Sequence, residues 1–77
     1  MQRLLSSKTN TPFKVHHVAF DDTNAECANH LQQIGFLPGE EVVVQRRSLF
    51  DPGPVVVRIG ASTFALRHCE AACIFVV

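Results

Sequence analysis

Tryptophan and tyrosine are both absent from this 77-residue chain, and neither sign of charge is in excess. Grooves that bind proline-rich peptides are lined with such aromatic side chains, so their absence argues against that mode of recognition. Seven basic residues balance seven acidic ones, which gives a formal net charge of zero. A nucleic-acid-binding protein needs a basic patch to neutralise phosphates, and electrostatic attachment to a membrane also needs basic clusters. The composition therefore argues against nucleic-acid and membrane-surface partners.

Long apolar segments are also missing. Residues 1–11 are mostly polar and lack the apolar core of a signal peptide. The longest apolar run, residues 71–77, is far shorter than the ~20 residues of a membrane-spanning helix. The cysteine count is odd and includes no CxxC pair, the members being Cys27, Cys69 and Cys73. A disulfide scaffold is therefore not expected, and we predict a soluble cytoplasmic protein with reduced thiols and no direct membrane insertion.

Recognisable catalytic motifs are lacking too. The chain has no GxxxxGK phosphate-binding loop, and no serine or cysteine stands in a known nucleophile motif. Cys69 directly follows His68, but neighbouring side chains on a strand point to opposite faces. We therefore predict that the protein is not an enzyme and requires no cofactor.

The chain does contain enough apolar material for a core, since 47% of its residues are hydrophobic and six are phenylalanine. A chain of this length makes one small domain, so we expect residues 1–77 to form a single domain. The pair Leu4-Leu5 is followed by a polar stretch. This pattern predicts a loosely held arm over residues 1–11, with the two leucines docking on the body.

A helix end followed by a turn is the most specific local signal. The spacing of apolar residues predicts a helix over residues 24–34, with a stripe of small and apolar side chains at Cys27, Ala28, Leu31 and Ile34. Thr23 and Glu26 have the spacing of a capping box. Gly35 fits the left-handed position after a helix, where Phe36 can fold back on Leu31. Next, Pro38-Gly39 occupies the two central positions of a predicted type II turn.

Five short strands are predicted from β-branched and aromatic runs, over residues 12–20, 41–49, 55–59, 63–67 and 73–77. A bulge near residues 18–20 would account for the mixed faces of the first strand. Gly60 marks a tight turn, and residues 68–72 can form one helical turn. The fold class predicted is mainly β: a small, partly open barrel of about five strands with one helix inserted after the first.

The chain resembles the FeoA family (ferrous iron transport protein A). The resemblance rests on Leu31, on residues 34–39 (IGFLPG), on Asp51-Pro52, on the 55–60 strand and glycine, on Leu66-Arg67, and on Glu70-Ala71 leading into residues 74–77. It implies an SH3-like barrel in which Leu31, Gly35, Pro38, Gly39 and Gly60 form the structural motif. It also implies a partner, the membrane ferrous iron permease FeoB, whose cytosolic portion carries a GTP-binding domain.

Two positions depart from the family pattern. The family often has Arg or Lys where His30 stands, and Gly is common where Phe50 stands. Phe50 is therefore an apolar residue at the tip of a stiff loop, which is a common mark of a contact site. The candidate partner-binding residues are Arg46, Arg47, Leu49, Phe50, Asp51, Pro52 and Arg67. The alternatives are a solvated sheet face and a loop tip that packs on its own barrel or on a second copy in a homodimer.

Four histidines in so short a chain suggest a different function. Imidazole, thiolate and carboxylate groups all suit zinc or ferrous iron, and Glu26 lies four residues before His30 on the predicted helix. The candidate ligands are His16, His17, Glu26, His30 and His68. The alternative hypothesis is therefore a small metal sensor or carrier. Because no spacing in the chain encloses four ligands, a weakly bound or adventitious zinc or iron ion is the simpler interpretation of these residues.

Overall fold

The computed structural model describes residues 1–20, 25–47 and 53–77 of the protein. Its elements, in chain order, are β1 (Gln2–Arg3), the 3-10 helix η1 (Leu4–Ser6), β2 (Pro12–Val18), α1 (Ala25–Gln33), β3 (Glu41–Arg47), β4 (Val55–Ile59), β5 (Ser62–Leu66), α2 (His68–Ala71) and β6 (Ile74–Val76). The five predicted strands and the helix are all present and differ from the prediction only at their ends. Thr23, one half of the predicted capping box, lies outside the described residues.

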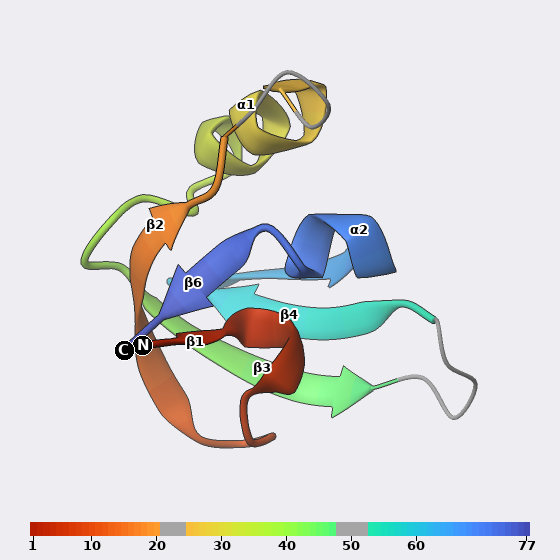
Figure 1. Ribbon diagram of the computed structural model, residues 1–77. Helices are drawn as coiled ribbons and strands as arrows, with labels where there is room; N and C mark the ends of the chain where they lie inside the picture. The colour runs from red at the N-terminus through yellow and green to blue at the C-terminus, as the bar shows by residue number, and fades with distance from the viewer. Residues whose placement is uncertain (21–24, 48–52) are drawn as a thin grey trace.

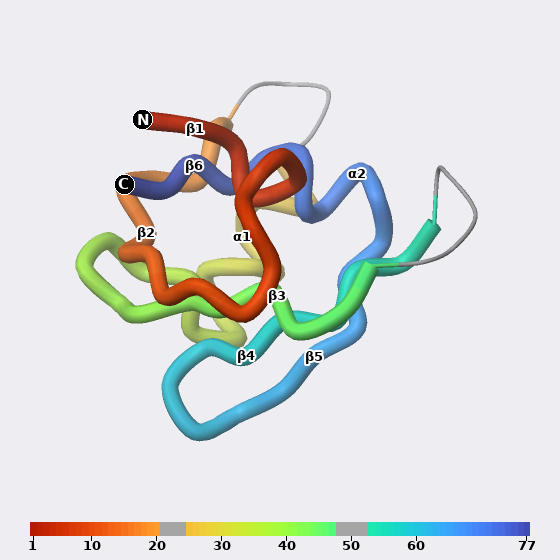
Figure 2. Tube along the Cα trace, turned by 90° about the horizontal axis from the view of Figure 1, so that it is seen from below, coloured from red at the N-terminus to blue at the C-terminus, as the bar shows by residue number. Residues whose placement is uncertain are grey.

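The strands in these ranges form one six-stranded antiparallel sheet in the order β1-β6-β2-β3-β4-β5. Figure 1 shows α1 beyond the end of β2, with α2 on the same side of the sheet. The two chain ends lie on one side of the molecule in Figures 1 and 2 because β1 pairs with β6, Gln2 facing Val76. The β3, β4 and β5 strands follow one another through hairpin pairings.

The N-terminal segment is part of the sheet and of the core, which differs from the loosely held arm that we expected. Leu4 is fully buried, and the Ser7 hydroxyl donates to the Leu4 carbonyl at 2.6 Å. The Arg47 guanidinium on β3 donates to the carbonyls of Leu5 and Ser7. The groups that anchor this segment belong to β3 and β6, which are distant in the sequence. The polar composition of residues 6–10 therefore did not indicate that the segment would be anchored. The docking predicted for Leu4 is confirmed.

The helix stop and the turn are confirmed. Gly35 has a φ of +115°, and its N–H donates to the Gln32 carbonyl while Phe36 N–H donates to the Leu31 carbonyl. These two bonds are those of a Schellman motif. Glu40 N–H then donates to the Leu37 carbonyl, and the intervening Gly39 has a φ of +91°, as a type II turn requires. The helix therefore delivers the chain directly into β3.

A register shift in β2 lies at His16, two residues earlier than predicted. Val15 pairs with Val76 while His17 pairs with Phe75. This extra residue lets both Val15 and Val18 point into the core, since a bulge shifts the alternation of a strand. β2 also changes its neighbour near this point, because its first three residues pair with β3 and its later residues pair with β6.

The core is drawn from η1, α1, α2 and all strands except β1. It contains Leu4, Val15, Val18, Ala28, Leu31, Phe36, Val42, Val44, Val55, Val57, Ile59, Leu66, Ala71, Cys73, Ile74 and Val76. Cys27 is only half-buried and lies outside this core cluster, although the apolar stripe predicted for the helix begins with it. Ala28 and Leu31 on α1 are fully buried, whereas Cys27 lines a groove between α1 and α2.

Candidate functional site

The outward face of β3, β4 and β5 carries exposed cations beside partly covered valines. Val43 pairs with Arg58, and Arg46 pairs with Val56. Both arginines are exposed and both valines are half-buried. Positions that are diagonal neighbours on one face of a sheet lie within reach of long side chains. This arrangement, named here the arginine face, offers an apolar centre with positive charge on either side.

Arg47, one of the candidate partner-binding residues, makes its contacts within the protein. It is half-buried, and its guanidinium is engaged by the carbonyls of Leu5 and Ser7. An arginine that satisfies two backbone acceptors is a structural link between segments. Arg47 therefore holds the N-terminal segment against β3 and is not part of the arginine face.

A hollow of about 570 Å³ lies where β4 begins and β5 ends, lined by Gly53, Pro54, Arg67, His68 and Cys69. Because Val55 pairs with Leu66, the chain that enters β4 is brought beside the chain that leaves β5. The structure thus places predicted residue Arg67 next to the last residues of the predicted loop. The other predicted loop residues, Leu49, Phe50, Asp51 and Pro52, lie outside the described residues.

A polar groove of about 290 Å³ separates α1 from α2 and is lined by Glu26, Cys27, His30, Arg67 and Glu70. Glu70 is its centre. Glu70 is 5% exposed, and its carboxylate accepts a bond from the Arg67 backbone N–H at 2.9 Å. It also lies 3.3 Å from Arg67 Nε and 3.4 Å from His30 Nδ1. The carboxylate thereby caps the first turn of α2 and joins it to α1.

Burial alone would raise the pKa of Glu70, but the bonds donated by Arg67 and His30 outweigh it and the pKa is lowered. The carboxylate is therefore held in its charged form. From the sequence, Glu70 was named only among the residues that carry the family resemblance, and this role was missed. The signal that could have revealed it is its position three residues after Arg67, which is where a helix-capping carboxylate stands.

The predicted metal ligands fall in three separate places. His16 and His17 lie on β2, with Nδ1 atoms 2.7 Å apart, and the His17 ring stacks on Phe75. Glu26 and His30 line the groove between the helices, and His68 lines the hollow beside β4. Within residues 1–20, 25–47 and 53–77, no three His, Cys, Asp or Glu side chains are grouped so as to hold a metal ion.

The three cysteines gather around the same pair of helices. Cys27 is half-buried on α1, Cys69 is exposed on α2, and Cys73 is buried just before β6. The Cys73 Sγ donates to the Cys69 carbonyl at 3.2 Å. Burial raises the pKa of the Cys27 thiol, and the neighbouring thiols of Cys69 and Cys73 raise it further. No disulfide joins any of the three.

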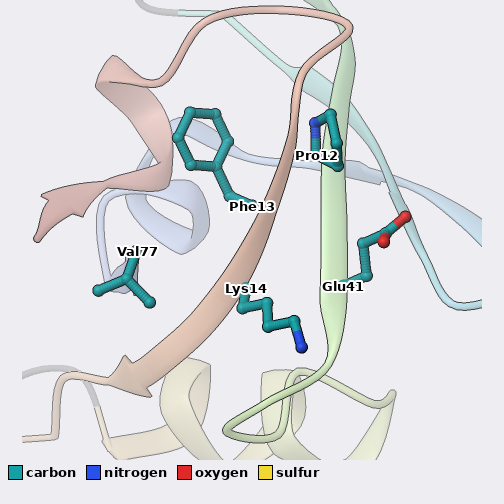
Figure 3. Close-up of a pocket in the computed structure, with 5 residues that line it drawn as sticks. All are labelled: Pro12, Phe13, Lys14, Glu41 and Val77. Atoms are coloured by element: carbon teal, nitrogen blue, oxygen red, sulfur yellow. The ribbon is translucent and has the colours of Figure 1, made fainter.

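A further hollow of about 260 Å³ lies where β2, β3 and the C-terminus meet, and is lined by Pro12, Phe13, Lys14, Glu41 and Val77. Figure 3 shows Phe13 and Val77 on one side of β2, with Glu41 on the other. Its lining includes none of the candidate partner-binding or metal-ligating residues. No helix in the described part of the chain is long and apolar enough to cross a membrane.

A family model described as the FeoA domain matches residues 3–77. The chain belongs to the FeoA family. This match covers the whole described fold from β1 onward and confirms the resemblance that was drawn from the turn and strand motifs. The family is associated with ferrous iron transport. No curated protein matched the chain.

Similar solved structures also include proteins of the FeoA family. FeoA of Stenotrophomonas maltophilia, solved with zinc, is 30% identical with a TM-score of 0.87, over 100% of this chain and 91% of that one. It is described as an SH3 domain protein and a candidate activating factor of ferrous iron transport. Iron(II) transport protein A of Clostridium thermocellum is 27% identical with a TM-score of 0.83, over 97% of this chain and 44% of that one.

The fold also occurs in larger proteins. A manganese-dependent transcriptional repressor is 22% identical with a TM-score of 0.83, over 99% of this chain and 40% of that one. At that identity the likeness concerns the fold alone. The predicted fold class, a mainly β SH3-like domain with a helix after the strand that begins at Pro12, is confirmed, with β1 as an added strand.

Proposed function

We propose that the protein is a cytoplasmic, non-enzymatic accessory factor of ferrous iron uptake that binds the cytosolic portion of the permease FeoB. In this proposal it supports or regulates Fe(II) transport or GTP hydrolysis by that partner. The observation that carries the proposal is the match to the FeoA family over residues 3–77. The absence of nucleophile and phosphate-loop motifs from the sequence is consistent with a binding role.

The proposed docking surface is the arginine face together with the loop that follows it. Arg46 is exposed on β3 directly before this loop, and Arg67 lines the hollow beside Gly53 and Pro54, the last residues of the loop. Leu49, Phe50, Asp51 and Pro52 are included from their sequence pattern, since apolar residues at a stiff tip often mark contacts. Apolar side chains flanked by arginine resemble the composition of interface centres.

The test is anaerobic co-purification of the protein with full-length FeoB, with and without a GTP analogue. Wild-type protein should be retained in at least one nucleotide state, and Phe50→Asp and Arg46→Asp should each abolish retention. Arg3→Asp is the matched control, because Arg3 is an exposed cation on β1 at the opposite end of the sheet order. Circular dichroism of each variant verifies the fold.

Two outcomes would count against this proposal. Retention that Phe50→Asp and Arg46→Asp leave unchanged would exclude this docking surface. Failure of the wild-type protein to be retained in any nucleotide state would contradict binding to the permease. Light scattering of the same samples tests the homodimer that the loop tip could form.

The second candidate function is a small metal sensor or carrier, and the zinc in the S. maltophilia structure is the observation that favours it. Two pairs of possible ligands lie close together among the described residues: His16 and His17, with Nδ1 atoms 2.7 Å apart, and His30 and Glu70, with nearest atoms 3.4 Å apart. Anaerobic titration with ferrous iron and zinc distinguishes the two functions. A one-to-one site tighter than micromolar that is lost in His30→Ala or His17→Ala would support the sensor, and weak binding alone would exclude it.

A further inference from the structure

The β5 strand lies at one end of the sheet order and has a free edge. Among residues 1–20, 25–47 and 53–77, β4 is the one strand that pairs with it. Figure 2 shows β5 at the margin of the molecule, with β4 on its inner side. The outer side of β5 therefore faces no other strand of the described fold.

The turn between β4 and β5 shows which backbone groups lie on this free edge. Ile59 pairs with Ser62 across a two-residue loop whose first residue, Gly60, has a φ of +58°, as in a type II′ hairpin. The residues that flank such a loop form a hydrogen-bonded pair, and these pairs alternate with non-hydrogen-bonded ones along an antiparallel ladder. The N–H and C=O groups of Thr63 and Ala65 therefore point away from β4.

The β5 strand lacks the features that usually protect a free edge. Its five residues, 62–66, include no charged residue, proline or glycine, and its pairing with β4 continues without a bulge. The strand at the other end of the sheet, β1, has only two residues, and one of them is Arg3. Because natural sheets blunt their edges with charge, proline, bulges or short strands, β5 is the edge suited to accept another strand.

The outward face beside this edge is basic. Arg58 pairs with Thr63, and Val56 lies between Arg46 and Ala65. An outward residue of a strand added next to β5 would lie two strand spacings, about 10 Å, from Arg58. Because the intervening Thr63 and Ala65 are small, an arginine and a glutamate side chain can meet across them. The added strand is therefore favoured if it is acidic.

A second copy of this chain would also fit the backbone of β5, but charge disfavours it. Pairing of β5 with β5 would join two arginine faces, so that Arg46 and Arg58 of both copies would share one surface. The strands β3, β4 and β5 contain a single acidic residue, Glu41, and it lies opposite Lys14 on β2. An acidic segment from another protein supplies the missing negative charge, whereas a second copy adds positive charge.

We propose that β5 binds an extended acidic segment of the partner protein as an added strand. The backbone groups of Thr63 and Ala65 pair with the segment, and carboxylates at alternate positions of the segment contact Arg58 and Arg46. This inference rests on the proposed function, because it names the kind of segment through which FeoB is bound.

The first experiment measures this edge without FeoB. The isotope-labelled full-length protein is titrated with a synthetic peptide of about eight residues that alternates valine with glutamate, and amide hydrogen exchange is followed by NMR. The peptide should slow exchange of the Thr63 and Ala65 amides, because these N–H groups become hydrogen-bonded. A peptide with lysine in place of glutamate should not do so, and added salt should weaken the effect of the acidic peptide.

Two variants separate the backbone contribution from the charge. Ala65→Pro removes one outward N–H, which an edge strand tolerates, and it should abolish binding of the acidic peptide. Arg58→Glu should also lose binding of the acidic peptide, whereas the matched charge reversal Arg3→Glu at the other end of the sheet should retain it. Circular dichroism verifies each fold, and the wild-type exchange data stand as a test that needs no variant.

Co-purification with full-length FeoB distinguishes this inference from the proposed function. Arg3→Glu should be retained like the wild type, and Ala65→Pro should be lost. Equal retention of Ala65→Pro would overturn the inference while leaving binding to FeoB intact. If the wild-type protein were not retained, the proposed function would fail, and the peptide titration would still decide whether β5 accepts an acidic strand.

Three results of the titration would overturn the inference. The first is unchanged exchange of the Thr63 and Ala65 amides with the acidic peptide, and the second is equal slowing by the lysine peptide. The third is slowing that appears without peptide and grows with protein concentration, because β5 would then pair with a second copy.

Discussion

Replacing Leu4 by alanine tests whether the N-terminal segment belongs to the folded core. Leu4 is fully buried in η1 and belongs to the same core cluster as the strands. The substitution removes three carbon groups, which at roughly 0.8 kcal/mol each amounts to about 2.4 kcal/mol of lost burial. A residual cavity brings the expected loss to about 3 kcal/mol. This is a large share of the 5–15 kcal/mol or so that keeps a small domain folded.

Urea denaturation followed by far-UV circular dichroism measures this loss, and thermal unfolding should show a fall in Tm of roughly 12 °C or more. Leu5→Ala is the matched control, because Leu5 is adjacent but only half-buried, and it should cost about 1 kcal/mol or less. If both variants were as stable as the wild type, the segment would be a dispensable arm and our account of β1 and η1 would be refuted.

Two further predictions concern the helix stop and the buried carboxylate. Gly35→Ala should lower the free energy of unfolding, measured by urea denaturation, by about 1 kcal/mol. The cause is conformational, because φ is +115° while no atom lies within 4 Å of the added Cβ. Gly35→Asn should therefore cost less, and equal losses for the two variants would contradict this cause. Glu70→Gln should cost about 1–2 kcal/mol at pH 7. Because the folded pKa of Glu70 is lowered from its ordinary 4.5, its contribution is present above that value and lost as the pH falls through the folded pKa. The difference from the wild type should therefore vanish in acid, and a difference independent of pH would contradict the assignment.

The local features of this fold were predictable because each depends on residues that are neighbours in sequence. Gly35 and Pro38-Gly39 have few conformations available, so a helix stop and a type II turn follow from their identity. The β4 strand has the predicted bounds because its alternation of valine and isoleucine with Arg58 is uninterrupted. The bulge in β2 was misplaced because Val18 and Phe20 broke the alternation visibly, whereas His16 did not.

The sequence by itself determined the order of the elements from β2 onward, the two glycine-dependent turns and the FeoA resemblance, since all of these depend on short-range patterns. The tertiary structure alone decided that Arg47 anchors the N-terminal segment and that Glu70 joins the two helices. In both cases the partner lies in another element. Spacing along a chain carries no information on which distant backbone carbonyl or side chain will be brought close, because that is fixed by packing of the whole sheet.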